Sequence, residues 1–438
     1  MLRTLCARAA YPLAEKVQGR QIRSKLAELR AQMALPFNKR AELRRKQLAE
    51  VLERAGSEVP YYRDLFARRH FRPQRLARDL GYLHELPYLT KDIIREQGTR
   101  MLSSALDRGS LHTRKTGGST GPSTTIYYSP EALDWTAAVN AATLAWAGKR
   151  PHAREVHLAS RFPEVFPWKD RFKEQLKCVA LNRTNIFTAD FEPESLQRIW
   201  TRICRVRPYL VQAHPSTLYA LANWLRSEGK PVRRAFQVFE STGEVLDDKK
   251  RELIQQVFGC RCVDRFGNAE FGILAYEPLG ERRLRVLDWV AWPEVATHES
   301  GTPELVFTGL LNPAMPLVRY RTGDLAELHD DRCGYYLGSI VGRVHDVVEI
   351  GANHYPTHYV QDLLDRIGGI EEFQIIRERA GAVMLRLVVP EAERRAAIAE
   401  RIGSWWPGAV RVEFTTFEKL VRTGWRGKFR YLVHADAA

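Results

Sequence analysis

A glycine-rich run with many hydroxyl side chains, residues 113–124, carries the chemistry in this chain that best suits phosphate binding. It reads Thr-Arg-Lys-Thr-Gly-Gly-Ser-Thr-Gly-Pro-Ser-Thr. Glycines let main-chain N–H groups approach a ligand closely, and hydroxyl groups add donors, which together suit a polyphosphate. The run lacks the lysine of a G-x-x-x-x-G-K-[ST] loop, and taken alone it is more typical of a flexible turn.

Five further polar motifs follow this run along the chain. Each motif by itself is also typical of an ordinary turn or of a basic tail. Their order and their intervals are far more specific than any one of them. The motifs are STGE at 241–244, RFGNAE at 265–270, YRTGD at 320–324, GRVHD at 342–346 and GWRGKFR at 424–430.

Two of the motifs adjoin a predicted β-α-β unit. The apolar run 235–240 predicts a strand, 246–258 predicts a helix with one apolar face, and 260–266 predicts a second strand. Such strands run parallel and are joined by a right-handed crossover. The loops 241–244 and 267–270 then fall at the carboxyl ends of parallel strands, where open α/β sheets bind ligands.

The remaining segments indicate an α/β fold with two domains. We predict a large N-terminal domain over 1–340, with mixed and parallel sheets and a helical extension at 1–60. A small α+β lid domain is predicted over 341–438, with a hinge near 342–346, because a compact unit of about a hundred residues follows the Gly- and Pro-containing β-rich part. Local patterns add helices at 41–56 and 391–402 and strands at 382–390 and 411–416.

Composition restricts the surroundings and the partners of the chain. The net charge of +15 suits nucleic acid, an anionic membrane, an acidic protein, or simply a solvated surface. No nucleic-acid-binding motif is present, so we expect no nucleic acid partner. There is no apolar run long enough for a transmembrane segment and no uninterrupted apolar secretory segment near the start. Six cysteines without disulfide or metal spacing favour a reducing, cytoplasmic location.

With these motifs in this order, the chain resembles the adenylate-forming superfamily, and within it the phenylacetate–CoA ligase branch that includes CapK-like proteins. The resemblance spans about residues 45 to 433 and includes the segment VPYYRDLF at 59–66. It implies an enzyme that uses ATP and Mg²⁺ to convert a carboxylic acid into an acyl adenylate, with release of pyrophosphate. The acyl group then passes to a phosphopantetheine thiol, either of CoA or of an acyl carrier protein.

The resemblance also implies roles for residues in the first three motifs. Glu270 would hold Mg²⁺ near the phosphates, because hard cations prefer carboxylate and phosphate oxygens. Phe266 would stack on the adenine base. The β- and γ-phosphates would be held by Gly117, Gly118, Ser119, Thr120, Gly121 and Thr124, and adenine would be contacted by Ser241, Thr242, Gly243 and Glu244.

Later motifs complete the implied site. Asp324 would accept hydrogen bonds from both ribose hydroxyls, because an ionised carboxylate only accepts. Arg343 would assist at the ribose, and residue 345 would be the hinge about which the small domain reorients. Lys428 would be the lid lysine, which stabilises the charge that develops on the reacting phosphate.

Several positions depart from the family pattern. Ala269 stands where Ser or Thr normally precedes the Mg²⁺ glutamate, and His345 stands at a hinge that is normally Asp or Lys. Residues 350–353 read Ile-Gly-Ala-Asn, without the arginine of the usual RGxN. The stretch after Glu270 offers no Cys/His ligand set, so no zinc is expected. These departures weaken the assignment of phenylacetate itself as the substrate.

The acid and the acceptor stay open between alternatives. Aromatic side chains between 135 and 245 suit an aryl acid, or are equally well ordinary core aromatics: Phe162, Phe166, Trp168 and Phe239. The branch implies CoA as the acceptor, whereas the basic surface also suits an acidic acyl carrier protein. The runner-up is a CapK-like ligase of a polysaccharide or natural-product pathway with an amine or hydroxyl acceptor, or a non-catalytic nucleotide-binding homologue.

Overall fold

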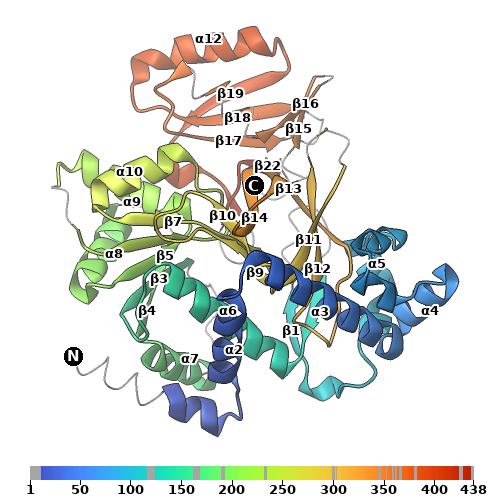
Figure 1. Cartoon of the computed structure of the whole chain (residues 1–438). Coiled ribbons are helices and arrows are strands. Elements are labelled where there is room, and N and C mark those ends of the chain that lie inside the picture. The colour runs from blue at the N-terminus through green and yellow to red at the C-terminus, as the bar shows by residue number, and fades with distance from the viewer. Residues whose placement is uncertain are drawn as a thin grey trace. The chain divides into compact units, whose positions relative to one another are not determined.

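Two compact units make up the chain, whose elements are drawn in Figure 1. The parallel-sheet unit combines His152–Cys262 with Val341–Ala438, and the antiparallel-sheet unit combines Arg8–Pro151 with Val263–Ile340. Within the described residues, no helix is both long and apolar enough to cross a membrane. The computed structural model describes residues 11–115, 124–160, 168–188, 193–230, 234–297, 301, 303–343, 347–351, 353–357, 360, 363–364, 367–378, 382–423 and 428–435.

A five-stranded sheet forms the centre of the parallel-sheet unit. Its strands are, in spatial order, β4 (Arg183–Thr188), β3 (Glu155–Ser160), β5 (Leu210–Ala213), β6 (Val238–Ser241) and β7 (Arg261–Val263). β3 pairs in parallel with β4 and β5, and β5 pairs in parallel with β6. The helices are α7 (Trp168–Ala180), α8 (Pro193–Val206), α9 (Pro215–Ser227) and α10 (Asp248–Phe258). Apolar side chains of α8, α9, α10 and the sheet share one core.

The predicted β-α-β unit is confirmed as β6, α10 and β7. Helix α10 begins after Asp247, because the Asp247 carboxylate accepts a hydrogen bond from the main-chain N–H of Lys250, 2.8 Å away. It ends at Gly259, which adopts a left-handed conformation with φ of +58°. The apolar face of α10 is buried through Leu253, Ile254 and Phe258.

The second strand is predicted over 260–266, and the position predicted for its end is wrong. β7 stops at Val263, and after Asp264 the chain enters β8 (Arg265–Asn268), which belongs to a different sheet. Glu277 fixes this change of sheet, because its N–H donates to the Asp264 carbonyl at 2.9 Å and its carboxylate accepts from the Asp264 N–H at 3.1 Å. Gly267 and Asn268, predicted as part of the loop, therefore belong to the strand β8, and Glu270 lies in the turn after it.

A seven-stranded sheet dominates the antiparallel-sheet unit. Its strands are, in spatial order, β11 (Ala291–Ala296), β12 (Glu304–Gly309), β13 (Tyr320–Asp331), β14 (Gly334–Arg343), β10 (Leu284–Val286), β9 (Gly272–Tyr276) and β8. A separate antiparallel hairpin consists of β1 (His112–Lys115) and β2 (Thr125–Tyr128), and α6 (Pro130–Trp146) follows it. The hairpin flanks the predicted phosphate loop on both sides.

Helices α2 (Ile22–Met33), α3 (Phe37–Glu58), α4 (Pro60–Arg69) and α5 (Lys91–Gln97) precede the hairpin. The helix predicted at 41–56 is confirmed and is longer at both ends. Gly56 does not end the helix but lies in its last turn. A glycine fits there because the ring of Phe66 packs against this position and leaves no room for a Cβ atom. Only Val59 separates α3 from α4.

The C-terminal segment of the parallel-sheet unit has a sheet of its own. Its order is β19 (Val410–Thr415), β18 (Val383–Val388), β17 (Glu372–Arg377) and β22 (Leu432–His434). The strands predicted at 382–390 and 411–416 are confirmed as β18 and β19, and the helix predicted at 391–402 corresponds to α12 (Arg395–Trp405). Two small pairs complete this segment: β15 (Val347–Ile350) with β16 (Asn353–Pro356), and β20 (Arg422–Thr423) with β21 (Lys428–Phe429).

A buried group of polar side chains joins the two segments of the parallel-sheet unit. The ammonium nitrogen of Lys250 in α10 lies 2.7 Å from the Asp247 carboxylate and 3.6 Å from that of Glu372 in β17. Lys250 also hydrogen-bonds the Tyr431 hydroxyl. Burial lowers the pKa of Lys250, but its partners Glu372, Tyr431 and Asp247 outweigh burial and raise it. The ammonium therefore stays charged inside the unit.

Candidate active site

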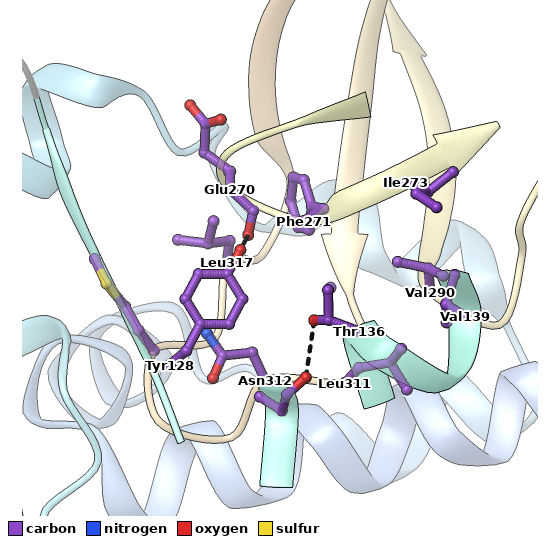
Figure 2. Close-up of a pocket in the computed structure, with 13 residues that line it drawn as sticks. Tyr128, Thr136, Val139, Glu270, Phe271, Ile273, Val290, Leu311, Asn312 and Leu317 are labelled. Atoms are coloured by element: carbon purple, nitrogen blue, oxygen red, sulfur yellow. Dashed lines mark hydrogen bonds between the residues drawn. The ribbon is translucent and has the colours of Figure 1, made fainter. Parts of the chain in front are cut away.

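Tyr128 ties the hairpin that flanks the phosphate loop to the turn that carries Glu270. The Tyr128 hydroxyl lies 2.6 Å from the carbonyl oxygen of Ala269 and 2.7 Å from that of Glu270, and it donates its proton there. Burial raises the pKa of Tyr128 to about 12, so the phenol keeps this proton at neutral pH. The end of β2 and the RFGNAE motif are thus held together although they are far apart in sequence (Figure 2).

The Glu270 carboxylate is buried, and the described residues bind only one of its two oxygens. Its Oε1 accepts a hydrogen bond from the hydroxyl of Tyr320, 2.7 Å away, and the ammonium of Lys91 lies 4.0 Å from the same atom. Among the described residues, no hydrogen bond or ion pair reaches Oε2. Tyr320 is completely buried, so the hydroxyl that fixes the carboxylate cannot turn toward solvent. Glu270 therefore presents one oriented oxygen with no protein partner in the described part of the chain.

This oxygen fits a magnesium ion that shares its other ligands with phosphate groups and water. Mg²⁺ is usually held by one or two protein carboxylates plus substrate oxygens, rather than by a complete protein cage. In the described part of the chain, no group of three or more His, Cys, Asp and Glu side chains could hold a metal ion. A single carboxylate with a fixed orientation is the kind of ligand that this arrangement needs.

Lys91 reaches Glu270 through an extra main-chain pairing to β13. The N–H of Leu89 donates to the Arg319 carbonyl at 3.0 Å, and the N–H of Arg321 donates to the Leu89 carbonyl at 2.9 Å. Lys91 is then the first residue of α5, where the positive end of a helix disfavours a cation. Helix stability therefore does not account for this lysine. At 4.0 Å its ammonium is beyond hydrogen-bond distance of Glu270, which leaves its donors for another acceptor.

The YRTGD motif is a strand rather than a simple turn, and it is fixed from the neighbouring strand β12. The Glu304 carboxylate accepts from the Gly323 N–H at 2.9 Å and also pairs with Arg321. Thr322 donates to the Leu305 carbonyl and accepts from the N–H of Asp324. Asp324 itself is buried, four residues after the tyrosine that holds Glu270. Tyr320 and Asp324 are therefore set by the same rigid strand.

In the parallel-sheet unit, the STGE loop lies where the sequence placed it, at the carboxyl end of β6. The Thr242 N–H donates to the carbonyl of Ala213 at the end of β5, 3.1 Å away. The Glu244 carboxylate accepts from both the N–H and the hydroxyl of Ser216, each at 3.0 Å. Gly243 has a φ of +79°, which favours glycine. Glu244 thus fastens this loop to the first turn of α9.

Comparison with known proteins finds relatives of this chain by sequence. The chain is 26% identical to the phenylacetate-coenzyme A ligase of Thermus thermophilus over 384 residues, which is 84% of this chain and 83% of that protein. It is 26% identical to the phenylacetate-coenzyme A ligase of Pseudomonas putida over 343 residues, covering 74% and 75% of the two chains. It is 20% identical to protein CapK of Staphylococcus aureus over 316 residues, covering 70% and 69%. No family profile matches the chain.

The fold agrees with these relatives. A solved structure of 2-hydroxyisobutyryl-CoA ligase in its postadenylation state superposes with a TM-score of 0.71, at 18% identity and over 91% of this chain and 90% of that one. The chain is thus similar to the adenylate-forming superfamily, and within it to the phenylacetate–CoA ligase-like branch. It is therefore an AMP-forming acid–thiol ligase by class.

The structure describes some of the residues implied by the family resemblance in full, others by their main chain alone, and others not at all. Thr124 of this ligase is buried directly before β2, and Phe266 lies half-buried in β8 beside Ala275. Arg343 ends β14, and Lys428 begins β21 opposite Thr423, but neither side chain is described. Outside the described residues lie Gly117, Gly118, Ser119, Thr120, Gly121, His345 and Asp346.

A pocket of the antiparallel-sheet unit adjoins the Glu270 turn (Figure 2). Its walls are mainly apolar, and Tyr128, Thr136 and Asn312 are its uncharged polar members. In Figure 2 the Glu270 carboxylate points away from these walls, whereas its main-chain carbonyl faces Tyr128. The pocket is thus separate from the carboxylate and does not suit phosphate groups. Its apolar lining consists of Ala132, Val139, Phe271, Ile273, Val290, Leu311, Met315 and Leu317.

The aromatic residues considered for the acid lie in different surroundings. Phe239 is completely buried in the core of the five-stranded sheet, as an ordinary core aromatic would be. Trp168 is 71% exposed at the start of α7. Phe162 and Phe166 lie outside the described residues. Sequence reasoning also missed two residues, Lys91 and the hydroxyl of Tyr320, because neither has a local pattern that distinguishes it from a helix start or a strand aromatic.

Proposed function

We propose that this ligase activates a small aryl carboxylic acid with ATP and Mg²⁺ and then transfers the acyl group to the thiol of CoA. The observation that carries the proposal is the buried Glu270 carboxylate, which Tyr320 fixes through one oxygen while the other has no partner in the described part of the chain. The curated relatives support the acid and the acceptor, because phenylacetate and coenzyme A appear in their names.

The residues of the antiparallel-sheet unit would act on the phosphates. Glu270 would hold the metal ion, which supplies charge neutralisation for the phosphate oxygens when bound. Tyr320 fixes the direction of the carboxylate. Lys91 would donate to a phosphate oxygen beside the metal, since its ammonium lies 4.0 Å from Oε1 of Glu270, beyond hydrogen-bond distance. The loop that β1 and β2 flank would hold the β- and γ-phosphates through Gly117, Gly118, Ser119, Thr120, Gly121 and Thr124.

The remaining roles follow the family pattern. Asp324 would accept hydrogen bonds from the ribose hydroxyls, Arg343 would assist at the ribose, and Phe266 would stack on adenine. The adenine edge would be contacted by Ser241, Thr242, Gly243 and Glu244. Residues 341–438 would act as a lid that turns near 342–346, and Lys428 would stabilise the charge that develops on the reacting phosphate.

Acid-dependent exchange between ATP and pyrophosphate tests the first half-reaction. A panel of aryl and alkyl acids should give exchange, and the aryl acids should be the better substrates. Exchange with alkyl acids alone would refute the aryl proposal but keep the ligase. No exchange with any acid of a broad panel would refute adenylate formation and favour a nucleotide-binding protein.

Supplied acyl adenylate tests the second half-reaction. Free CoA should be converted to a thioester, and this reaction should not need a protein partner. The charge of +15 also favours an acidic acyl carrier protein, so the holo form of such a protein is the matched competitor. Transfer to the carrier protein but not to CoA would overturn the acceptor proposed here. Transfer to an amine or a hydroxyl alone would favour a CapK-like role.

A further inference from the structure

Helix α7 exposes the apolar face that a helix of a globular protein normally buries. Trp168, Phe172, Leu176 and Val179 are 71%, 55%, 54% and 40% exposed. At about 100° per residue these four positions lie within an arc of about 80°, so they form one stripe along the helix.

The opposite side of α7 faces the sheet with polar atoms. Glu174 accepts a hydrogen bond from the side-chain amide of Asn185 in β4, 3.1 Å away, and the Cys178 thiol lies 3.8 Å from Glu174. Both Glu174 and Cys178 are partly covered, in contrast to the stripe. Figure 1 shows α7 beside β4, which is the edge strand of the sheet. A polar side thus faces the protein and an apolar side faces outward, which is the reverse of the usual arrangement.

Basic residues border the stripe on both sides. Lys169 and Lys173 follow one edge, and Arg171 lies near the other edge, as their spacing around the helix requires, whereas Lys177 lies farther round the helix and pairs with Glu174. Such residues can extend their charged ends outward while their methylene groups lie along apolar surface. Phe187 of β4, two residues beyond Asn185 on the same face of the sheet, is also 51% exposed.

The charges decide between the surfaces that could cover this stripe. A second copy of the chain would bring its own lysines and arginine against the first, and like charges across an interface repel. Each chain also carries a net charge of +15, which adds to the repulsion. An anionic surface would instead gain from every one of these cations. Aromatic and aliphatic side chains on one face, with Lys and Arg along its borders, are the features of a helix that lies in a membrane interface.

We propose that α7 is a membrane-surface anchor. Its stripe of Trp168, Phe172, Leu176 and Val179 enters the headgroup region of an anionic lipid bilayer, and its bordering Lys and Arg side chains contact lipid phosphates. The attachment is reversible and depends on salt, because a helix of 13 residues inserts few apolar side chains and its charges are screened by ions.

Vesicle binding of the intact chain tests the proposal. Flotation with vesicles of equal parts phosphatidylglycerol and phosphatidylcholine should recover the protein, whereas pure phosphatidylcholine should not. The double variant Phe172→Ser/Leu176→Ser should bind the anionic vesicles roughly tenfold more weakly. A control variant, Leu35→Ser/Val295→Ser, removes two other exposed apolar side chains and should bind like the wild type. The variant Lys169→Gln/Lys173→Gln should show a weaker dependence on salt.

Three results would overturn the anchor. One is the absence of binding to anionic vesicles at low salt. Another is a dimer by analytical ultracentrifugation that Phe172→Ser/Leu176→Ser converts to a monomer, because the stripe would then be an interface between copies. The third is equal loss of binding in the control variant. Thermal unfolding of each variant shows that it is folded, which the exposure of all substituted side chains leads us to expect.

Discussion

The hydroxyl of Tyr320 lies 2.7 Å from Oε1 of Glu270, and both side chains are buried. This hydrogen bond spans 50 residues of sequence and orients the carboxylate proposed to hold Mg²⁺. Since the tyrosine is on β13 and the glutamate is in the turn between β8 and β9, two separate parts of one sheet determine the position of one oxygen atom.

Replacement of Tyr320 by Phe should lower the rate of adenylate formation about tenfold, equivalent to about 1.4 kcal/mol. The ring stays, but the carboxylate loses its fixed direction, so the magnesium concentration for half-maximal exchange should rise. Titration of ATP–pyrophosphate exchange with Mg²⁺ measures both effects. Tyr62→Phe is the matched control, because its hydroxyl donates to the Pro316 carbonyl in the core, and it should leave the magnesium dependence unchanged. An unaltered magnesium dependence in Tyr320→Phe would contradict the role of this hydrogen bond.

Replacement of Lys91 by Met should weaken the use of ATP while the protein remains folded. The substitution keeps most of the side-chain length and removes the charge beside Glu270, so we expect the KM for ATP to rise several-fold. Lys91→Arg should recover part of the loss, since it restores the cation. Lys46→Met on the exposed side of α3 is the control for loss of one positive charge. If both methionine variants behave alike, Lys91 has no specific place at the phosphates.

Lys428→Ala should abolish adenylate formation and largely spare thioester formation from supplied acyl adenylate. The reason is that a lid lysine would stabilise charge only while the phosphate reacts. Separate assays of the two half-reactions give the answer. Equal losses in both would show that Lys428 acts on something other than the first step, or supports the fold of the lid.

Gly267→Ala should strongly destabilise the antiparallel-sheet unit. A Cβ atom at this position would overlap the carbonyl oxygen of Gly272 across the β8–β9 pair, and main-chain atoms there cannot move aside easily. We expect a loss of about 3 kcal/mol in the free energy of unfolding, in the range of backbone strain in tight sites. Gly403→Ala in α12 has open space around its Cβ and should be neutral or slightly stabilising. Denaturant unfolding of both variants makes the comparison.

Tyr128 should make the stability of the protein sensitive to alkali. Its folded pKa is about 12 against an ordinary value of 10.0, chiefly because of burial. A raised pKa stabilises the fold fully below the unfolded value, and this contribution of about 3 kcal/mol is lost as pH rises from 10 toward 12. Tyr128→Phe should therefore lose less stability than the wild type between these pH values. Identical alkaline slopes in urea unfolding would refute the assignment.

Local patterns in the sequence were enough to place the STGE loop. The apolar strand before it, the Asp247 cap and the Gly259 stop all act within a few residues, so the β-α-β unit could be read from one segment. The change from one sheet to the other at Asp264 could not be predicted in this way, because it depends on Glu277, which lies 13 residues farther along the chain. Periodicity does not tell which sheet a short strand joins.

The same limit applies to the site. Glu270 could be named from its motif, but its orientation depends on Tyr320, and Lys91 arrives through the pairing of Leu89 with the strand. Nothing within the local sequence of Lys91 distinguishes it from any lysine at the start of a helix. Long-range pairing brings these groups together, and it is visible only once the fold is known.

The buried ammonium of Lys250 has a consequence for work with shortened chains. A fragment that ends at the predicted boundary near residue 340 would keep α9 and α10 but lose Glu372 and Tyr431. Lys250 would then lose two partners that stabilise its charge inside the protein, in the same unit that carries the STGE loop. Deleting the C-terminal segment would thus damage a folded unit as well as remove the proposed lid. Substitutions in the intact chain are therefore the way to separate the catalytic role proposed for this segment from its contribution to the stability of the unit.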